Sequence, residues 1–151
     1  MQKLKVLLFL LIAIPIFSQN EKPTNSGKEE VYVFDRLTII YHPQKLPISI
    51  DKEFIPQGAD IIVSTEYRGN FYESAESSLI YTTQDKKEDI LKFYEEIFKL
   101  QEWRILQKEA KDNAYMLLTE SPYKKIFTVH IQDEINKRKV KLFFRKTGVS
   151  F

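Results

Sequence analysis

The sequence has few of the side chains that commonly carry catalysis or bind metal ions. It contains no cysteine and only two histidines, His42 and His130, which lie 88 positions apart. Neither histidine has a carboxylate at the spacing of a metal-binding motif, and the lack of cysteine excludes disulfides, thiolate ligands and cysteine nucleophiles. We therefore expect no metal site, no cofactor and no catalytic residue, and we expect that the protein is not an enzyme.

Other residue types supply no further catalytic motif. The four glycines are widely spaced, so no phosphate-binding loop is present, and the serines near position 77 lack the flanking glycines of a nucleophile elbow. Asp85, Glu88 and Asp89 cluster where a helix is predicted to begin. The helix dipole favours negative charge at that end, so this cluster needs no metal ion to account for it.

Residues 1–18 have the features of a secretory signal peptide. Lys3 and Lys5 precede a twelve-residue, almost wholly apolar stretch at 6–17, and the small Ser18 follows it. Twelve helical residues span about 18 Å, whereas the hydrocarbon core of a bilayer is about 30 Å thick. We expect cleavage after Ser18 and export to the periplasm or the extracellular medium, with no transmembrane helix in the mature form. The alternative is an uncleaved N-terminal anchor.

Removal of the signal leaves a polar leader and one domain. Residues 19–30 predict a flexible leader, and residues 31–151 are long enough for a single domain with its own core. The whole chain has 23 basic and 21 acidic residues, and Lys3 and Lys5 leave with the signal, so 21 of each remain. A neutral mature protein does not favour nucleic acid or a generic membrane surface as its partner.

Residues 86–100 predict the one strong helix. Its seven large apolar side chains fall on one half of the helical wheel and its charged side chains on the other half. Asp85 and Glu88 have the spacing of a capping box. An apolar surface this wide suits a helix lying across a sheet, with Phe93 and Tyr94 filling the space between them.

The other predicted elements are strands, rich in Val, Ile, Phe, Tyr and Thr and separated by turn residues. They lie at residues 31–42, 61–67, 71–83, 103–108, 114–119, 126–132 and 139–145. Asp35-Arg36 is a candidate break in the first run. We expect an α+β fold, with one main amphipathic helix packed on one face of an antiparallel sheet, in the order β-β-β-α-β-β-β-β. Short loops favour the pairing of consecutive strands.

An ordered series of motifs resembles a group of small exported bacterial α+β domains of unknown function, often found in lipoproteins. The likeness spans about residues 54–144. The matching motifs are Pro56-Gln57-Gly58-Ala59, the helix start Asp85-x-x-Glu88, Phe93-Tyr94 within the helix, and Trp103 before a meander of strands. Two features depart from that pattern: Glu102 stands where glycine commonly precedes the tryptophan, and no cysteine is available for lipidation. The resemblance implies an envelope or secreted domain and supplies no catalytic residue.

A sheet with a single helix has a second face that the helix does not cover. The side chains predicted to point to that face are Lys139, Lys141, Phe143, Arg145 and His130. Residues 124–151 hold eight basic and two acidic residues, a net charge of +6. We hypothesise that this face docks an anionic envelope partner, which is a protein, a glycan or a lipid head group. The competing interpretations are an ordinary solvated face, and coverage of Phe143 by the first strand or by the C-terminal tail.

The sequence therefore predicts an exported envelope or secreted protein that binds or modulates another component without catalysis. Two alternatives from other classes stay open. One is a small hydrolase-like enzyme in which a histidine and a carboxylate meet in space. The other is a structural envelope component that associates with itself through its sheet edges.

Overall fold

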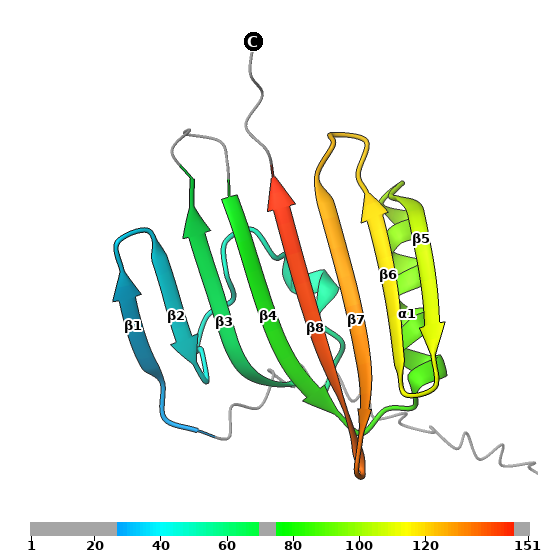
Figure 1. The fold of residues 1–151 in the computed structure, drawn as a ribbon, viewed down its shortest axis with the longest axis horizontal. Coiled ribbons are helices and arrows are strands. Elements are labelled where there is room, and N and C mark those ends of the chain that lie inside the picture. Colours follow the sequence, from blue (N-terminus) through cyan, green and yellow to red (C-terminus); the bar gives the residue numbers. More distant parts are fainter. Residues whose placement is uncertain (1–26, 70–74, 147–151) are drawn as a thin grey trace, which may run out of the picture.

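The fold is a single antiparallel sheet with one helix against it (Figure 1). The computed structural model describes residues 27–69 and 75–146. The strands are β1 (Glu30–Phe34), β2 (Leu37–Tyr41), β3 (Asp60–Arg68), β4 (Ala75–Thr83), β5 (Arg104–Lys111), β6 (Ala114–Glu120), β7 (Ile126–Glu134) and β8 (Lys137–Lys146). The helices are the short 3₁₀ helix η1 (Lys52–Phe54) and α1 (Lys87–Leu100). The strand order is β1-β2-β3-β4-β8-β7-β6-β5.

The predicted α+β class is wrong, because strands dominate the chain. Strands account for 54% of the structure and helix for 15%, so the protein is mostly β. The predicted order is also short by one strand before the helix. Asp35 adopts a positive φ of 46°, which closes a two-residue turn with Arg36 and divides the run at 31–42 into the hairpin β1–β2. The predicted signal, residues 1–18, and the start of the strand predicted at 71–83 lie outside the described residues.

The helix connects two parallel strands at distant places in the sheet. Each pair of neighbours from β4 through β8, β7 and β6 to β5 is antiparallel, so β4 and β5 run in the same direction. Such strands need a long crossover connection, and α1 is part of it. The predicted pairing of consecutive strands is confirmed from β5 to β8. Strand β8 then pairs with β4, which lies far from it in the sequence. This pairing joins the strands that precede the helix to those that follow it.

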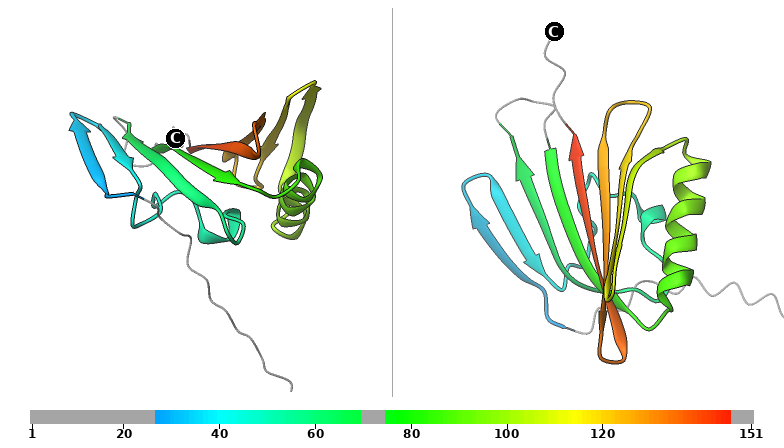
Figure 2. Two further views of the ribbon diagram at one scale, coloured as in Figure 1. Left: turned by 90° about the horizontal axis from the view of Figure 1, so that it is seen from below. Right: turned by 45° about the vertical axis from the view of Figure 1, so that its right-hand side comes forward.

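The core lies between the sheet and one layer made of α1 and η1, both on the same side of the sheet (Figure 2). Ile90, Tyr94 and Phe98 of α1 and Phe54 of η1 are buried there. The buried side chains of β4, β8, β7 and β6 beneath them are Leu79, Tyr81, Val140, Leu142, Phe144, Phe127, Val129, Ile131 and Leu117. The predicted inward alternation on β7 and β8 is therefore confirmed.

A chain of two hydrogen bonds crosses this core. The Tyr94 hydroxyl donates to the backbone carbonyl of Phe54 over 3.0 Å, and the hydroxyls of Tyr81 and Tyr94 lie 3.0 Å apart. Because the single proton of Tyr94 is used on Phe54, Tyr81 is the donor in the second bond. Burial raises the pKa of both phenols above the usual value, so both stay neutral at physiological pH. The chain links β4, α1 and η1.

Because Tyr81 donates to Tyr94 and Tyr94 donates to Phe54, removing one or the other hydroxyl should have unequal effects on stability. We expect Tyr94→Phe to lower the free energy of unfolding by about 1–3 kcal/mol, because the Tyr81 hydroxyl and the Phe54 carbonyl would both be buried without a partner. Tyr81→Phe is the matched control and should cost about 0.5–1.5 kcal/mol, since Tyr94 keeps its acceptor. Urea unfolding measures both, and equal losses would contradict the proposed direction of the bonds.

The helix lies within one residue of its predicted position, but its predicted capping box is wrong. The N-cap residue is Lys86, and no side chain makes a capping hydrogen bond there. Asp85 turns back to the preceding strand, where its carboxylate accepts a hydrogen bond of 2.9 Å from the Thr83 hydroxyl. Asp85 and Glu88 have the spacing of a capping box, but the Asp85 carboxylate accepts from the Thr83 hydroxyl and not from an N–H of the first helical turn.

The C-terminal end of the helix is a Schellman motif. The N–H of Trp103 donates to the Phe98 carbonyl over 2.8 Å, and the N–H of Glu102 donates to the Lys99 carbonyl over 3.3 Å. The rings of Phe98 and Trp103 lie 5.8 Å apart, which is the apolar contact that accompanies this motif. Glu102 takes the left-handed position with φ of 59°.

We expect Glu102→Gly to raise the free energy of unfolding by about 0.5–1 kcal/mol, because glycine adopts a positive φ without the clash of a Cβ. Glu96→Gly, at an exposed site inside α1, is the control and should lower the same quantity by about 1 kcal/mol. Thermal and urea unfolding test the pair. A loss of stability in both variants would show that Glu102 is not strained.

Candidate binding face

The period of two along β8 places the predicted site residues on the face away from α1. Val140, Leu142 and Phe144 point into the core, so the side chains between them point outward. The outward set on β8 is Lys139, Lys141, Phe143 and Arg145. His130 of β7 pairs directly with Lys141 and shares this face. All five predicted side chains thus lie on one surface, which we call the open face.

The open face is less positive than the net charge of +6 over residues 124–151 indicates, because acidic side chains lie beside its basic ones. The Lys139 ammonium lies 2.6 Å from a carboxylate oxygen of Glu134, and the Arg145 guanidinium lies 3.0 Å from that of Glu76. The bond from Lys139 holds the pKa of the Glu134 carboxyl below its usual range. Lys141 is exposed, and among the described residues no carboxylate forms an ion pair with it. Lys141 is therefore the cation of the predicted set without a direct ion pair, although its charge also helps to hold the pKa of the Glu134 carboxyl low.

Exposed aromatic side chains extend the open face to the edge of the sheet. Across neighbouring strands, Phe143 is in register with Ser78, which is followed by Thr65, Ile39 and Tyr32. The large apolar side chains of this face that remain exposed are Phe34, Tyr32, Tyr41, Tyr67 and Phe143. We call these five the aromatic set. The first strand is paired within the sheet and does not cover Phe143, and the tail, residues 147–151, lies outside the described part.

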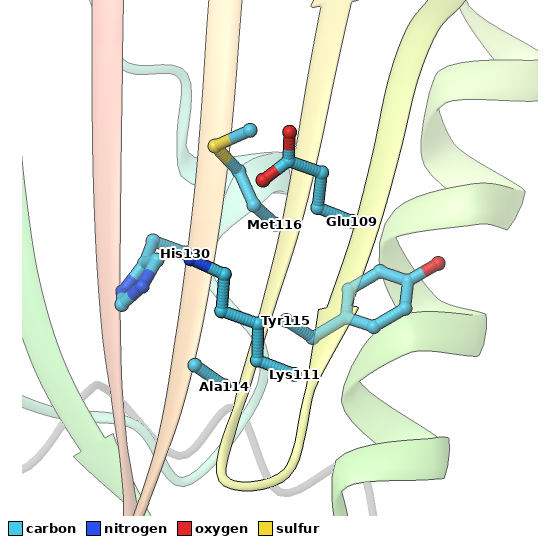
Figure 3. A pocket seen from close by; sticks show the side chains of 6 residues that line it. All are labelled: Glu109, Lys111, Ala114, Tyr115, Met116 and His130. Carbon is cyan, nitrogen blue, oxygen red and sulfur yellow. The ribbon is translucent and has the colours of Figure 1, made fainter.

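A shallow hollow of about 170 Å³ adjoins this surface over β5, β6 and β7 (Figure 3). Its lining residues are Glu109, Lys111, Ala114, Tyr115, Met116 and His130. In the register of the sheet His130 pairs with Met116, which pairs with Glu109. The Nδ1 atom of His130 is buried and has no hydrogen-bond partner among the described residues. The sequence did not predict this hollow, because its members meet only through the registers of two hairpins.

The two histidines are not brought together. His42 follows β2, and three strands separate β2 from β7, which carries His130. Within residues 27–69 and 75–146, no group of three or more His, Asp or Glu side chains has the arrangement of a metal site. The same residues include no helix that is both long and apolar enough to cross a bilayer. The side chains that the open face presents to solvent are cationic and aromatic.

Comparison with known proteins adds no assignment. No family model matches the sequence, and no curated protein matches it.

Proposed function

We propose that the protein is an exported binding module whose open face docks an acidic segment of a partner protein in the envelope. The observation that carries this proposal is the combination of the aromatic set with the exposed Lys141, which has no direct ion pair among the described residues, on one uncovered surface. The apolar stretch and basic flank of residues 1–18 support export.

The aromatic set supports a protein as the partner. Large exposed apolar patches on soluble proteins mark interaction sites, and the centres of protein interfaces are enriched in Tyr, Phe, Met and Arg. The open face has Tyr and Phe in the aromatic set, with Met116 in the adjoining hollow and Arg145 on β8. The hollow beside this face, about 170 Å³, is smaller than the usual small-molecule pocket, which favours an extended or helical segment of a partner as the occupant.

The charge pattern supports an acidic partner. Lys139 and Arg145 already have carboxylates within 2.6 and 3.0 Å, whereas Lys141 lies between them in the alternation of β8 without one. A carboxylate from a partner would pair with Lys141 next to the apolar contact made by Phe143. Electrostatic pairing of this kind chiefly selects the partner and speeds encounter, and the aromatic contacts supply most of the affinity.

The binding test uses a random copolymer of Glu and Tyr as a model acidic segment. We expect the protein to bind immobilised copolymer, and we expect Lys141→Glu to weaken binding by about tenfold because attraction becomes repulsion at the interface. Lys99→Glu, on the exposed side of α1, should bind like the unchanged protein. Higher salt should weaken binding of the unchanged protein and of Lys99→Glu.

Two anionic surfaces of other classes are tested in parallel. These are vesicles of phosphatidylglycerol and an immobilised polyuronate glycan. The protein could bind one of these surfaces and not the copolymer. If Lys141→Glu also lost that binding, the open face would serve a lipid or a glycan and not a protein. Equal binding of the copolymer by both lysine variants would contradict a role for this face.

Export has a separate test. We expect the protein in the periplasmic or extracellular fraction of producing cells, with an intact mass that begins at Gln19. Leu8→Arg should keep the chain inside the cell with residues 1–18 attached, because a charge interrupts the apolar stretch. Thr24→Arg, in the polar leader, is the matched control and should be exported. Retention of the unchanged chain in the cytoplasm would contradict export.

A further inference from the structure

Strands β1 and β5 form the two edges of the sheet (Figure 1). Their residues differ in how they protect each edge against pairing with another chain. The edge strand β5 has charged residues along its length, and its register is irregular between Ile105 and Gln107. Lys108 of β5 also bonds to Glu95 of α1 over 2.6 Å. Charges and bulges are the devices by which proteins keep an edge strand from recruiting another strand. The β5 edge is therefore blocked.

The opposite edge, β1, has none of these devices in its last four residues. Val31, Tyr32, Val33 and Phe34 are 53%, 46%, 66% and 58% exposed, so apolar side chains stand in solvent on both faces of one strand. The residues that flank the two-residue turn, Phe34 and Leu37, form a hydrogen-bonded pair, as such hairpins do. The alternation of an antiparallel ladder then directs the N–H and C=O groups of Val31 and Val33 outward.

We propose that β1 pairs antiparallel with β1 of a second copy of this chain, around a two-fold axis at Val33. In this register Val33 faces its own counterpart in a hydrogen-bonded pair, and Tyr32 faces Phe34 of the second copy. The Tyr32–Phe34 pair occurs twice by symmetry at positions without ladder hydrogen bonds, where opposite side chains are closest. Aromatic pairs across strands are among the contacts that stabilise a sheet.

The charges at the two ends of β1 favour a second copy and this register. Glu30 begins the strand, and its carboxylate already leans along the open face, where it accepts a hydrogen bond of 3.1 Å from the Tyr32 hydroxyl. Antiparallel pairing around Val33 brings Glu30 of one copy alongside the turn that holds Arg36 of the other, twice by symmetry. A two-fold axis at Tyr32 would instead oppose Glu29 and Asp35, and like charges opposite each other destabilise a sheet.

The resulting dimer has one continuous sheet. A two-fold axis perpendicular to the sheet keeps both open faces on the same side, so the two aromatic sets adjoin across β1. The interface is a single pair of short strands, smaller than a standard protein interface, so we expect a dissociation constant on the order of 10 µM. This inference rests on the edge and not on the binding activity proposed for the open face, so either can fail alone.

Sedimentation of the protein, as it is isolated from cells, tests the dimer. We expect a monomer–dimer equilibrium in the micromolar range and at least about tenfold weaker association for Val33→Lys, which sets two ammonium groups opposite each other. Leu106→Lys, a similar change on the blocked edge β5, should leave the equilibrium unchanged. A protein that is monomeric at several hundred micromolar, or one whose dimer persists in Val33→Lys, would overturn the proposal.

A cross-linking experiment tests the register without weakening the edge. The chain has no cysteine, so Val33→Cys supplies the only thiol. Hydrogen-bonded residues in an antiparallel pair have Cα atoms about 5.5 Å apart, which a disulfide spans. Mild oxidation should convert Val33→Cys to a covalent dimer and leave the control Leu106→Cys largely monomeric. Equal cross-linking of the two variants, or none in either, would contradict pairing through β1.

Discussion

The two faces of the sheet differ, because α1 and η1 cover only one of them. The hydrogen bonds of the Tyr94 hydroxyl hold this covering layer in place. These bonds, to Phe54 and Tyr81, tie η1, α1 and β4 together at the centre of the core. A buried hydroxyl has to be bonded, so these bonds fix how η1 and α1 lie on the sheet. Those two elements form the covering layer of one face, and it leaves the other face to solvent or to a partner.

The open face takes its character from that asymmetry. A strand alternates its side chains between the two faces, so each apolar residue that β7 and β8 place in the core is followed by one on the open face. Phe143 is the outward neighbour of Leu142 and Phe144 for this reason. The ion pairs of Lys139 and Arg145 then remove much of the charge that the sequence count indicates. The surface that remains has the aromatic set, with Lys141 on β8 and Lys111 in the adjoining hollow as exposed cations.

Patterns of short period could be read from the sequence, and contacts between distant segments could not. The amphipathic helix and the alternation at Phe127 and Val140 follow from periods of 3.6 and 2, so their positions were predicted correctly. The pairing of β4 with β8 and the hollow at His130 depend on registers that no local pattern encodes. The failed cap at Asp85 has a different origin, because its competing donor, Thr83, lies only two residues before it. The spacing of a capping box does not show which of two local partners the Asp85 carboxylate takes.

Strand β1 belongs to both the open face and the free edge, and this joins the two surfaces. Tyr32 and Phe34 are members of the aromatic set, and the same strand offers the outward backbone groups of Val31 and Val33. A partner strand at this edge buries part of the aromatic set and brings a second set beside it, so association at the edge changes the area available on the face. Edge and face are therefore thermodynamically linked: a segment that binds across both aromatic sets stabilises the dimer, and one that competes for β1 dissociates it.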